Sequence, residues 1–165
     1  MVAKRRKSKK RSSTSTLSEK QLKRTTFFLE RSFGGTLVLE ELRNAGLKVE
    51  PHQARFRHNT PDTEWLAVVG EKKWIVLMRD QNIGRRPLEL EALLRASVRS
   101  FVLVEGQLPD RENAKILIKA IPRMFELISE HRSPFIARVR RDSSVVLWKT
   151  KALGLTTSSK KMEQK

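Results

Sequence analysis

Three acidic residues occupy positions from which they could act together on a metal ion. Glu30 comes directly after the apolar run 26–29, Asp80 follows a second apolar run at 74–78, and Asp62 begins the helix that leads into that second run. In a parallel sheet the working crevice lies outside the carboxyl ends of the strands, where these side chains can meet. Converging carboxylates suit Mg²⁺ or Mn²⁺, which activate water and screen phosphate charge. Glu30, Asp62 and Asp80 are therefore the predicted metal ligands and catalytic residues.

Each of these acids also has a purely structural interpretation. Glu30 could pair with a neighbouring arginine at the surface, and Asp62 could complement the first turn of its helix. Asp80 could serve the turn that ends its strand. Glu64 takes the place of Asp62 in the prediction if Asp62 faces away from the other acids.

Basic and aromatic side chains near the acids suggest contacts with nucleic acid. The polar segment 51–61 is predicted to be a functional loop in which the histidines are solvated. Within it, Phe56 is the candidate for stacking on a base, whereas Trp65 and Trp74 fit core positions. The predicted phosphate contacts are arginines of this segment or close to the acids in sequence: Arg31, Arg55, Arg57, Arg79, Arg85 and Arg86.

The charge balance points to a polyanionic partner. The chain has 165 residues, with 35 Lys and Arg against 18 Asp and Glu, and a formal net charge of +17. Such a field favours salt-dependent binding of nucleic acid but says nothing about catalysis. The absence of cysteine excludes disulfides, thiolate metal sites and cysteine nucleophiles. No apolar run approaches the roughly 20 residues of a membrane span, so a cytoplasmic protein without membrane contact is expected.

Strand and helix patterns alternate through residues 25–148, which we assign to one domain. The basic stretches 1–24 and 149–165 are expected to be disordered arms. Alternation of this kind predicts an α/β fold with a mostly parallel sheet covered on both faces. Pro122 is expected to kink or split the last helix, and Thr60 to cap an earlier one. The expected strands are 26–29, 47–50, 74–78 and 100–104, the helices are 37–45, one opening at Thr60, 88–96 and 109–131, and a final hairpin joins 135–140 to 145–148.

Two stretches of the sequence resemble the PIN-like nucleases, in particular the VapC-type toxin ribonucleases and their compact relatives. The stretches are FFLERSFGG and PDTEWLAVVGEKKWIVLMRDQNI, and the resemblance covers most of 27–147. It implies a three-layer α/β/α domain with a mostly parallel central sheet and a C-terminal antiparallel hairpin. It also implies that Glu30, Asp62 and Asp80 bind Mg²⁺ for RNA hydrolysis, and that an antitoxin and a second copy of the chain are partners.

The sequence departs from this family pattern at three positions. Glu30 stands where aspartate is usual, Met78 where threonine is usual, and Asn82 where a further aspartate often occurs. Two alternatives to a Mg²⁺-dependent ribonuclease remain, of which these departures favour the first. One is a non-catalytic RNA-binding module on a decayed PIN-like fold. The other is an RNA- or ribosome-associated protein in which the basic arms carry the function.

Overall fold

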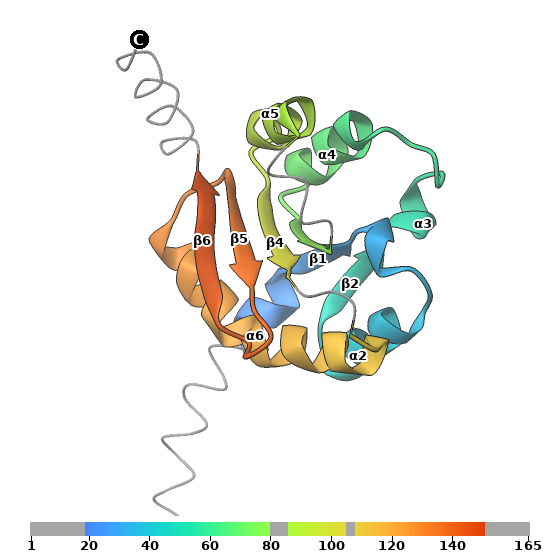
Figure 1. Ribbon diagram of the computed structural model, residues 1–165, viewed down its shortest axis with the longest axis vertical. Coiled ribbons are helices and arrows are strands. Elements are labelled where there is room, and N and C mark those ends of the chain that lie inside the picture. The colour runs from blue at the N-terminus through green and yellow to red at the C-terminus, as the bar shows by residue number, and fades with distance from the viewer. Residues whose placement is uncertain (1–18, 80–85, 105–107, 151–165) are drawn as a thin grey trace, which may run out of the picture.

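The computed structural model describes residues 19–79, 86–104 and 108–150 and shows a six-stranded sheet in the order β2-β1-β3-β4-β5-β6 (Figure 1). The first five strands are parallel, and β6 runs antiparallel to β5. The mostly parallel sheet and the final hairpin are therefore confirmed. The strands are β1 (Thr26–Leu29), β2 (Lys48–Pro51), β3 (Ile75–Met78), β4 (Arg99–Leu103), β5 (Phe135–Val139) and β6 (Val145–Thr150).

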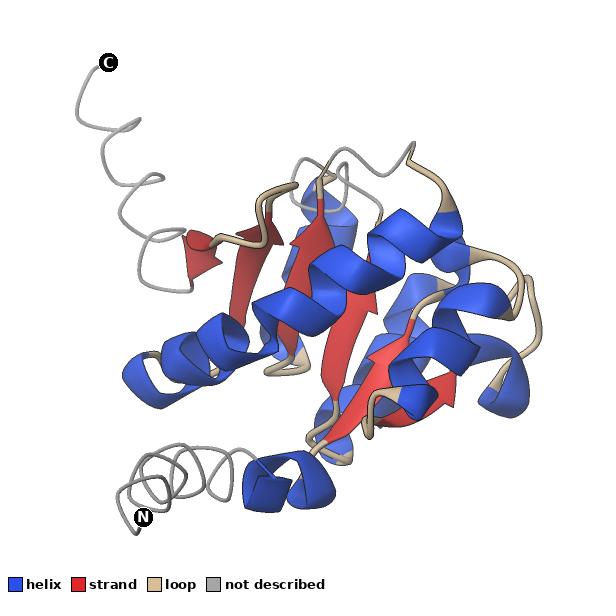
Figure 2. Ribbon diagram, turned by 90° about the horizontal axis from the view of Figure 1, so that it is seen from below, coloured by secondary structure: helices blue, strands red, loops and turns tan. Residues whose placement is uncertain are grey.

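Helices cover both faces of the sheet, which gives three layers. The helices α2 and α6 lie on one face and α4 and α5 on the other, with the strands between them (Figures 1 and 2). The helical elements are η2 (Arg31–Phe33), α2 (Leu37–Asn44), α3 (His52–Arg55), α4 (Asp62–Glu71), α5 (Pro87–Arg95) and α6 (Asp110–Glu130). None of the described helices is long and apolar enough to cross a membrane.

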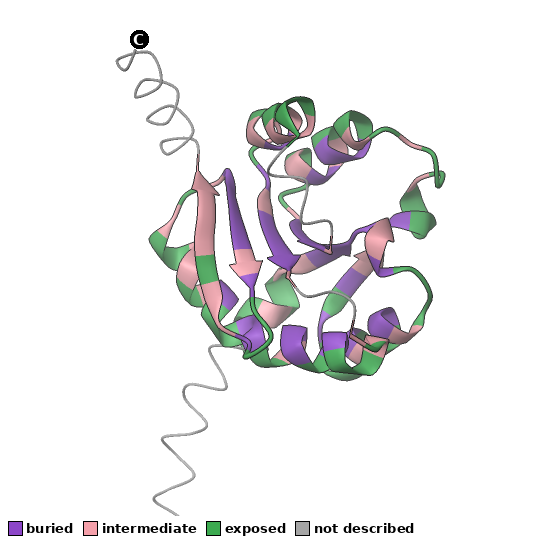
Figure 3. Ribbon diagram, viewed as in Figure 1, coloured by how far each residue is buried: buried purple, intermediate pink, exposed green. Residues whose placement is uncertain are grey.

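The apolar runs of the sequence become strands that are buried on both sides. Because successive side chains of a strand point to opposite faces, Phe27 and Leu29 pack against α2 and α6, whereas Phe28 packs against α4. The same alternation holds in β3, which is buried at all four positions. Burial is concentrated in the central strands, and the exposed residues lie on the outer sides of the helices (Figure 3). The central strands thus form a rigid base for the residues that follow their carboxyl ends.

The structure differs from the sequence-based expectations in three local features. Segment 51–61 is not a loop throughout, because its first part forms the short helix α3. Thr60 does not cap α4, whose N-cap residue is Pro61 and makes no side-chain capping bond. Of the two effects expected of Pro122, a split of α6 is not observed, because the helix continues from Asp110 to Glu130 with Pro122 exposed.

The expected N-terminal arm overlaps with folded structure. Residues 19–24 are helical, and Leu22 packs against the core on the α2 and α6 side. At the other end, β6 extends to Thr150, two residues past the expected domain boundary. The remainder of both arms, at 1–18 and 151–165, lies outside the described residues.

Candidate functional site

Glu30 is held at the carboxyl end of β1 by the backbone on both sides of it. Its N–H donates to the carbonyl of Leu77 at 2.9 Å, so the pairing of β1 with β3 continues up to this residue. Its Oε2 accepts the N–H of Ser32 at 2.9 Å, and Glu30 is thereby the N-cap of η2. The residue is only 7% exposed. A buried carboxylate is thus fixed at the edge of the sheet where the sequence places it.

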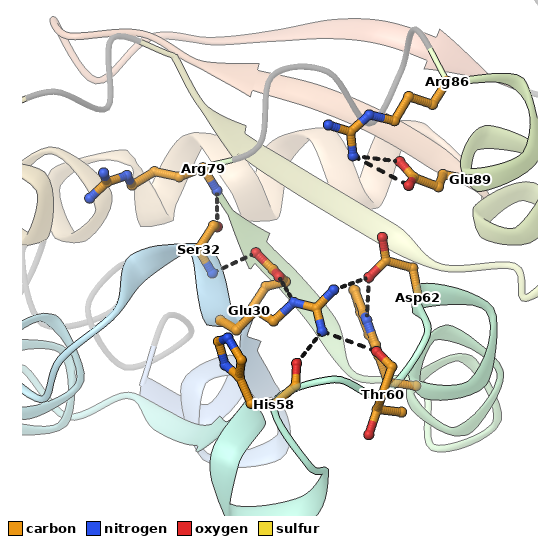
Figure 4. Close-up of polar contacts among 10 residues, drawn as sticks. Glu30, Ser32, His58, Thr60, Asp62, Arg79, Arg86 and Glu89 are labelled. Carbon is orange, nitrogen blue, oxygen red and sulfur yellow. Dashed lines mark hydrogen bonds and ion pairs between the residues drawn. The ribbon is translucent and has the colours of Figure 1, made fainter.

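Ser32 connects this end of β1 to the end of β3. Its Oγ accepts the backbone N–H of Arg79 at 2.9 Å (Figure 4). Arg79 is the last described residue before Asp80, which lies outside the described residues. The chain at the end of β3, as far as Arg79, therefore lies directly beside the segment that carries Glu30.

Asp62, the first residue of α4, is held by side chains. Its Oδ1 accepts the indole N–H of Trp65 at 2.8 Å and a guanidinium N–H of Arg31 at 3.2 Å. Trp65 is fully buried, so it fixes the carboxylate relative to the core. The carboxylate is therefore oriented toward the end of β1.

Arg31 brings Glu30 and Asp62 together. Its Nε lies 3.6 Å from Glu30 Oε1, and its Nη2 lies 3.2 Å from Asp62 Oδ1. Its Nη1 also donates to the carbonyls of His58 and Thr60 at 2.6 and 3.0 Å. Two of the three predicted ligands, Glu30 and Asp62, thus contact the same guanidinium group, that of Arg31. Within the described ranges, no group of three or more histidine, aspartate or glutamate side chains could hold a metal ion.

Burial changes the proton affinity of Glu30. Loss of solvent raises the pKa of its carboxyl group, and the negative charge of Asp62 raises it further. The hydrogen bonds from Ser32 and the positive charge of Arg31 act in the opposite direction on this pKa. The net effect is upward, so this carboxyl group keeps a proton at a higher pH than an exposed glutamate does.

Arg79 interacts with an acid that sequence reasoning overlooked. Its Nη1 lies 3.9 Å from Oδ1 of Asp110, the first residue of α6, which follows β4 at the same edge of the sheet. The Pro109–Asp110 pair repeats the Pro61–Asp62 pair that opens α4, and in both cases the proline is the N-cap. That repeated pattern was the signal in the sequence. Asp110 adds a further carboxylate to the edge that carries Glu30.

The other predicted phosphate contacts are dispersed. Arg55 pairs with Glu50 at 3.3 Å and lies 5.3 Å from the ring centre of Trp74. Arg86 pairs with Glu89 at 3.1 Å at the start of α5. Arg57 is exposed. Arg85 lies outside the described part of the chain.

His52 and Phe56 belong to the core and not to a solvated loop. His52 is 1% exposed, and its Nε2 has no hydrogen-bond partner among the described residues. Its ring packs against Phe28, Phe56 and Trp65, with ring centres 5.5 to 6.2 Å apart. Phe56 is half-buried and lies edge-on to Phe28, so its ring is used in packing. The expectation of solvated histidines is wrong for His52 because tertiary packing encloses it.

We expect the burial of His52 to make the protein less stable in mild acid. Desolvation lowers the pKa of His52 from its usual 6.5, and the positive charges of Arg31 and His58 lower it further, whereas Asp62 opposes them. As pH falls through 6.5, the unfolded chain binds a proton that the folded protein does not, so the free energy of unfolding falls. His52→Phe should weaken this pH dependence in thermal unfolding between pH 7.5 and 5.5. His131→Gln is the control, because His131 lies at the C-terminal end of α6 and not among the groups that act on His52. An unchanged pH dependence in His52→Phe, or an equal change in His131→Gln, would contradict the assignment.

Part of the chain that carries this site matches a known protein family. Residues 25–105 match the family described as the PIN like domain. This region, just under half of the 165 residues, is PIN-like by sequence. The match runs from β1 past β4 and includes all three predicted ligands, whereas α6 and the terminal hairpin lie beyond it. The three-layer fold agrees with this assignment.

A curated relative of this PIN-like domain is a Mycobacterium tuberculosis protein named "Putative ribonuclease VapC45". It is 30% identical over 78 residues, which are 45% of this chain and 56% of the relative. The chain thus matches only a little over half of the relative's length. No solved structure matches the chain.

Proposed function

We propose that this PIN-like domain is a metal-dependent ribonuclease that hydrolyses RNA phosphodiester bonds, with Glu30, Asp62 and Asp80 as the metal ligands. The observation that carries the proposal is the convergence of Glu30 and Asp62 on one cation at the carboxyl edge of the sheet. The similarity to a protein named as a ribonuclease supports RNA as the substrate.

The chemistry of the site suits Mg²⁺ or Mn²⁺. Both ions prefer oxygen ligands, and each carboxylate keeps one oxygen that accepts no hydrogen bond from the described residues, namely Glu30 Oε1 and Asp62 Oδ2. Asp80 lies outside the described residues and enters the proposal from the sequence, where it comes directly after Arg79, whose backbone N–H donates to Ser32 Oγ. When bound, the ion would polarise the phosphate and lower the pKa of a water ligand.

The protein's own residues supply orientation and charge around that ion. Ser32 and Trp65 fix the directions of the Glu30 and Asp62 carboxylates through the hydrogen bonds described above. Arg57 and Arg79 are proposed phosphate contacts, and the net charge of +17 favours a polyanion in general. We extend the proposal to the biological setting that the family resemblance implies, a cytoplasmic toxin with an antitoxin partner and a second copy of the chain.

A non-catalytic RNA-binding module is the second candidate function. It is favoured by the position of Arg31, which already neutralises two of the three proposed ligands. It is also favoured by the use of Glu30 where the family pattern has the shorter aspartate. This candidate predicts RNA binding without turnover.

Removal of the metal separates the two candidates. Purified protein should cleave a panel of structured and single-stranded RNAs in Mg²⁺ or Mn²⁺, and cleavage should fall to background in EDTA and return when the ion is restored. Tight RNA binding without cleavage in either ion would favour the non-catalytic module. Cleavage that persists in EDTA would contradict a metal-dependent mechanism.

A further inference from the structure

The guanidinium group of Arg31 is surrounded by oxygen atoms. Two come from the carboxylates of Glu30 and Asp62, and two come from the backbone carbonyls of His58 and Thr60. Carboxylate and carbonyl oxygens are also the ligands that hard divalent cations select. Arg31 therefore occupies a position with the ligand chemistry of a metal site.

Arg31 also balances the charge of the two acids. Glu30 and Asp62 repel each other when both are ionised, and a cluster of carboxylates needs a nearby cation to stay charged. The contacts of Arg31 with both acids meet this need in the protein without metal. A divalent ion brought to the same oxygens would be repelled by the positive charge already present.

The side chain of Arg31 is more open to solvent than the two acids that it contacts. It is 30% exposed, compared with 8% for Glu30 and 16% for Asp62. A long arginine side chain can carry its charged end into water while its stem stays packed. Withdrawal of the guanidinium would therefore expose Glu30 Oε1 and Asp62 Oδ1 without unpacking the core.

We infer that Arg31 is a built-in counter-cation of Glu30 and Asp62, and that a divalent ion binds only as its guanidinium withdraws from them. This inference rests on the proposed metal site and adds a residue that sets the metal affinity. Arg31 is accordingly a positioning residue that lowers the affinity for metal and stabilises the protein in its absence.

The test is direct binding of Mn²⁺ to the full chain, measured by electron paramagnetic resonance, together with thermal unfolding in EDTA. Arg31→Gln removes the charge and should bind Mn²⁺ at least about tenfold more tightly than the unchanged protein. The same variant should unfold at a lower temperature in EDTA, and saturating Mn²⁺ should reduce that difference. Arg31→Lys keeps the charge, so its affinity should stay close to that of the unchanged protein.

Arg95→Gln provides the control, because it removes the same charge from an exposed pair with Glu91 on α5. It should change neither the Mn²⁺ affinity nor the response of the unfolding temperature to Mn²⁺. If the unchanged protein binds Mn²⁺ and folded Arg31→Gln binds it no more tightly, the inference is overturned while the metal site stands. If neither protein binds Mn²⁺, the proposed metal site fails as well.

Discussion

Asp62→Asn is expected to reduce metal-dependent RNA cleavage by about two orders of magnitude while RNA binding stays intact or becomes tighter. Asparagine retains an oxygen that can accept the N–H of Trp65, so the side chain should keep its place on α4. It lacks the negative charge that attracts a divalent ion and balances Arg31. Removing one preorganised group that stabilises charge in a transition state commonly costs about 100- to 1,000-fold in rate. Cleavage and binding of the same RNA by the variant are the measurements.

Glu64→Gln is the matched control for Asp62→Asn. Glu64 lies two residues along the same helix and is exposed, so its replacement removes the same charge without touching Arg31 or Trp65. Cleavage by Glu64→Gln should stay within about twofold of the unchanged protein, as is usual for a surface substitution. An equal loss of cleavage in both variants would show that the rate depends on the overall negative charge of this helix and not on the position of Asp62.

The strands and long helices could be predicted because burial leaves a direct pattern in the sequence. Uniformly apolar runs predicted β1, β3 and β4, which are covered on both faces, and residues at helical spacing predicted α2, α5 and α6. The helix α3 was missed because four residues carry too little periodicity to distinguish them from a loop. Its burial depends on contacts of His52 with Phe28 and Trp65, which are distant in sequence.

The site was predictable only in outline. Its acids follow or precede strongly patterned elements, so their shared edge could be inferred, and the structure brings Glu30 and Asp62 to one guanidinium. The orientation of Arg31 was not predictable, because it joins residues 31 positions apart and depends on the path of the chain before α4. The sequence alone predicts that Arg31 contacts phosphate, whereas its side chain is bonded to Glu30, Asp62 and two backbone carbonyls.

Arg79 and Asp110 illustrate the same limit at the edge of the sheet. The sequence also predicts Arg79 as a phosphate contact, and the structure shows its backbone N–H bonded to Ser32 and its side chain beside Asp110. Asp110 could have been identified only by comparing the two Pro-Asp pairs that open helices. Sequence patterns identify which residues reach the edge, but not which of them pair with each other there.

The most direct test of a metal-dependent nuclease at this edge is RNA cleavage by Asp80→Asn and by the unchanged protein, each in Mn²⁺ and in EDTA. Asp80 follows the most uniformly buried strand and is the proposed ligand that only the sequence assigns. We expect the unchanged protein to cleave in Mn²⁺ alone, and Asp80→Asn to bind the same RNA but to cleave it at least about 100-fold more slowly. Cleavage by Asp80→Asn at the rate of the unchanged protein would contradict the proposal that the active site lies at the carboxyl edge of the sheet.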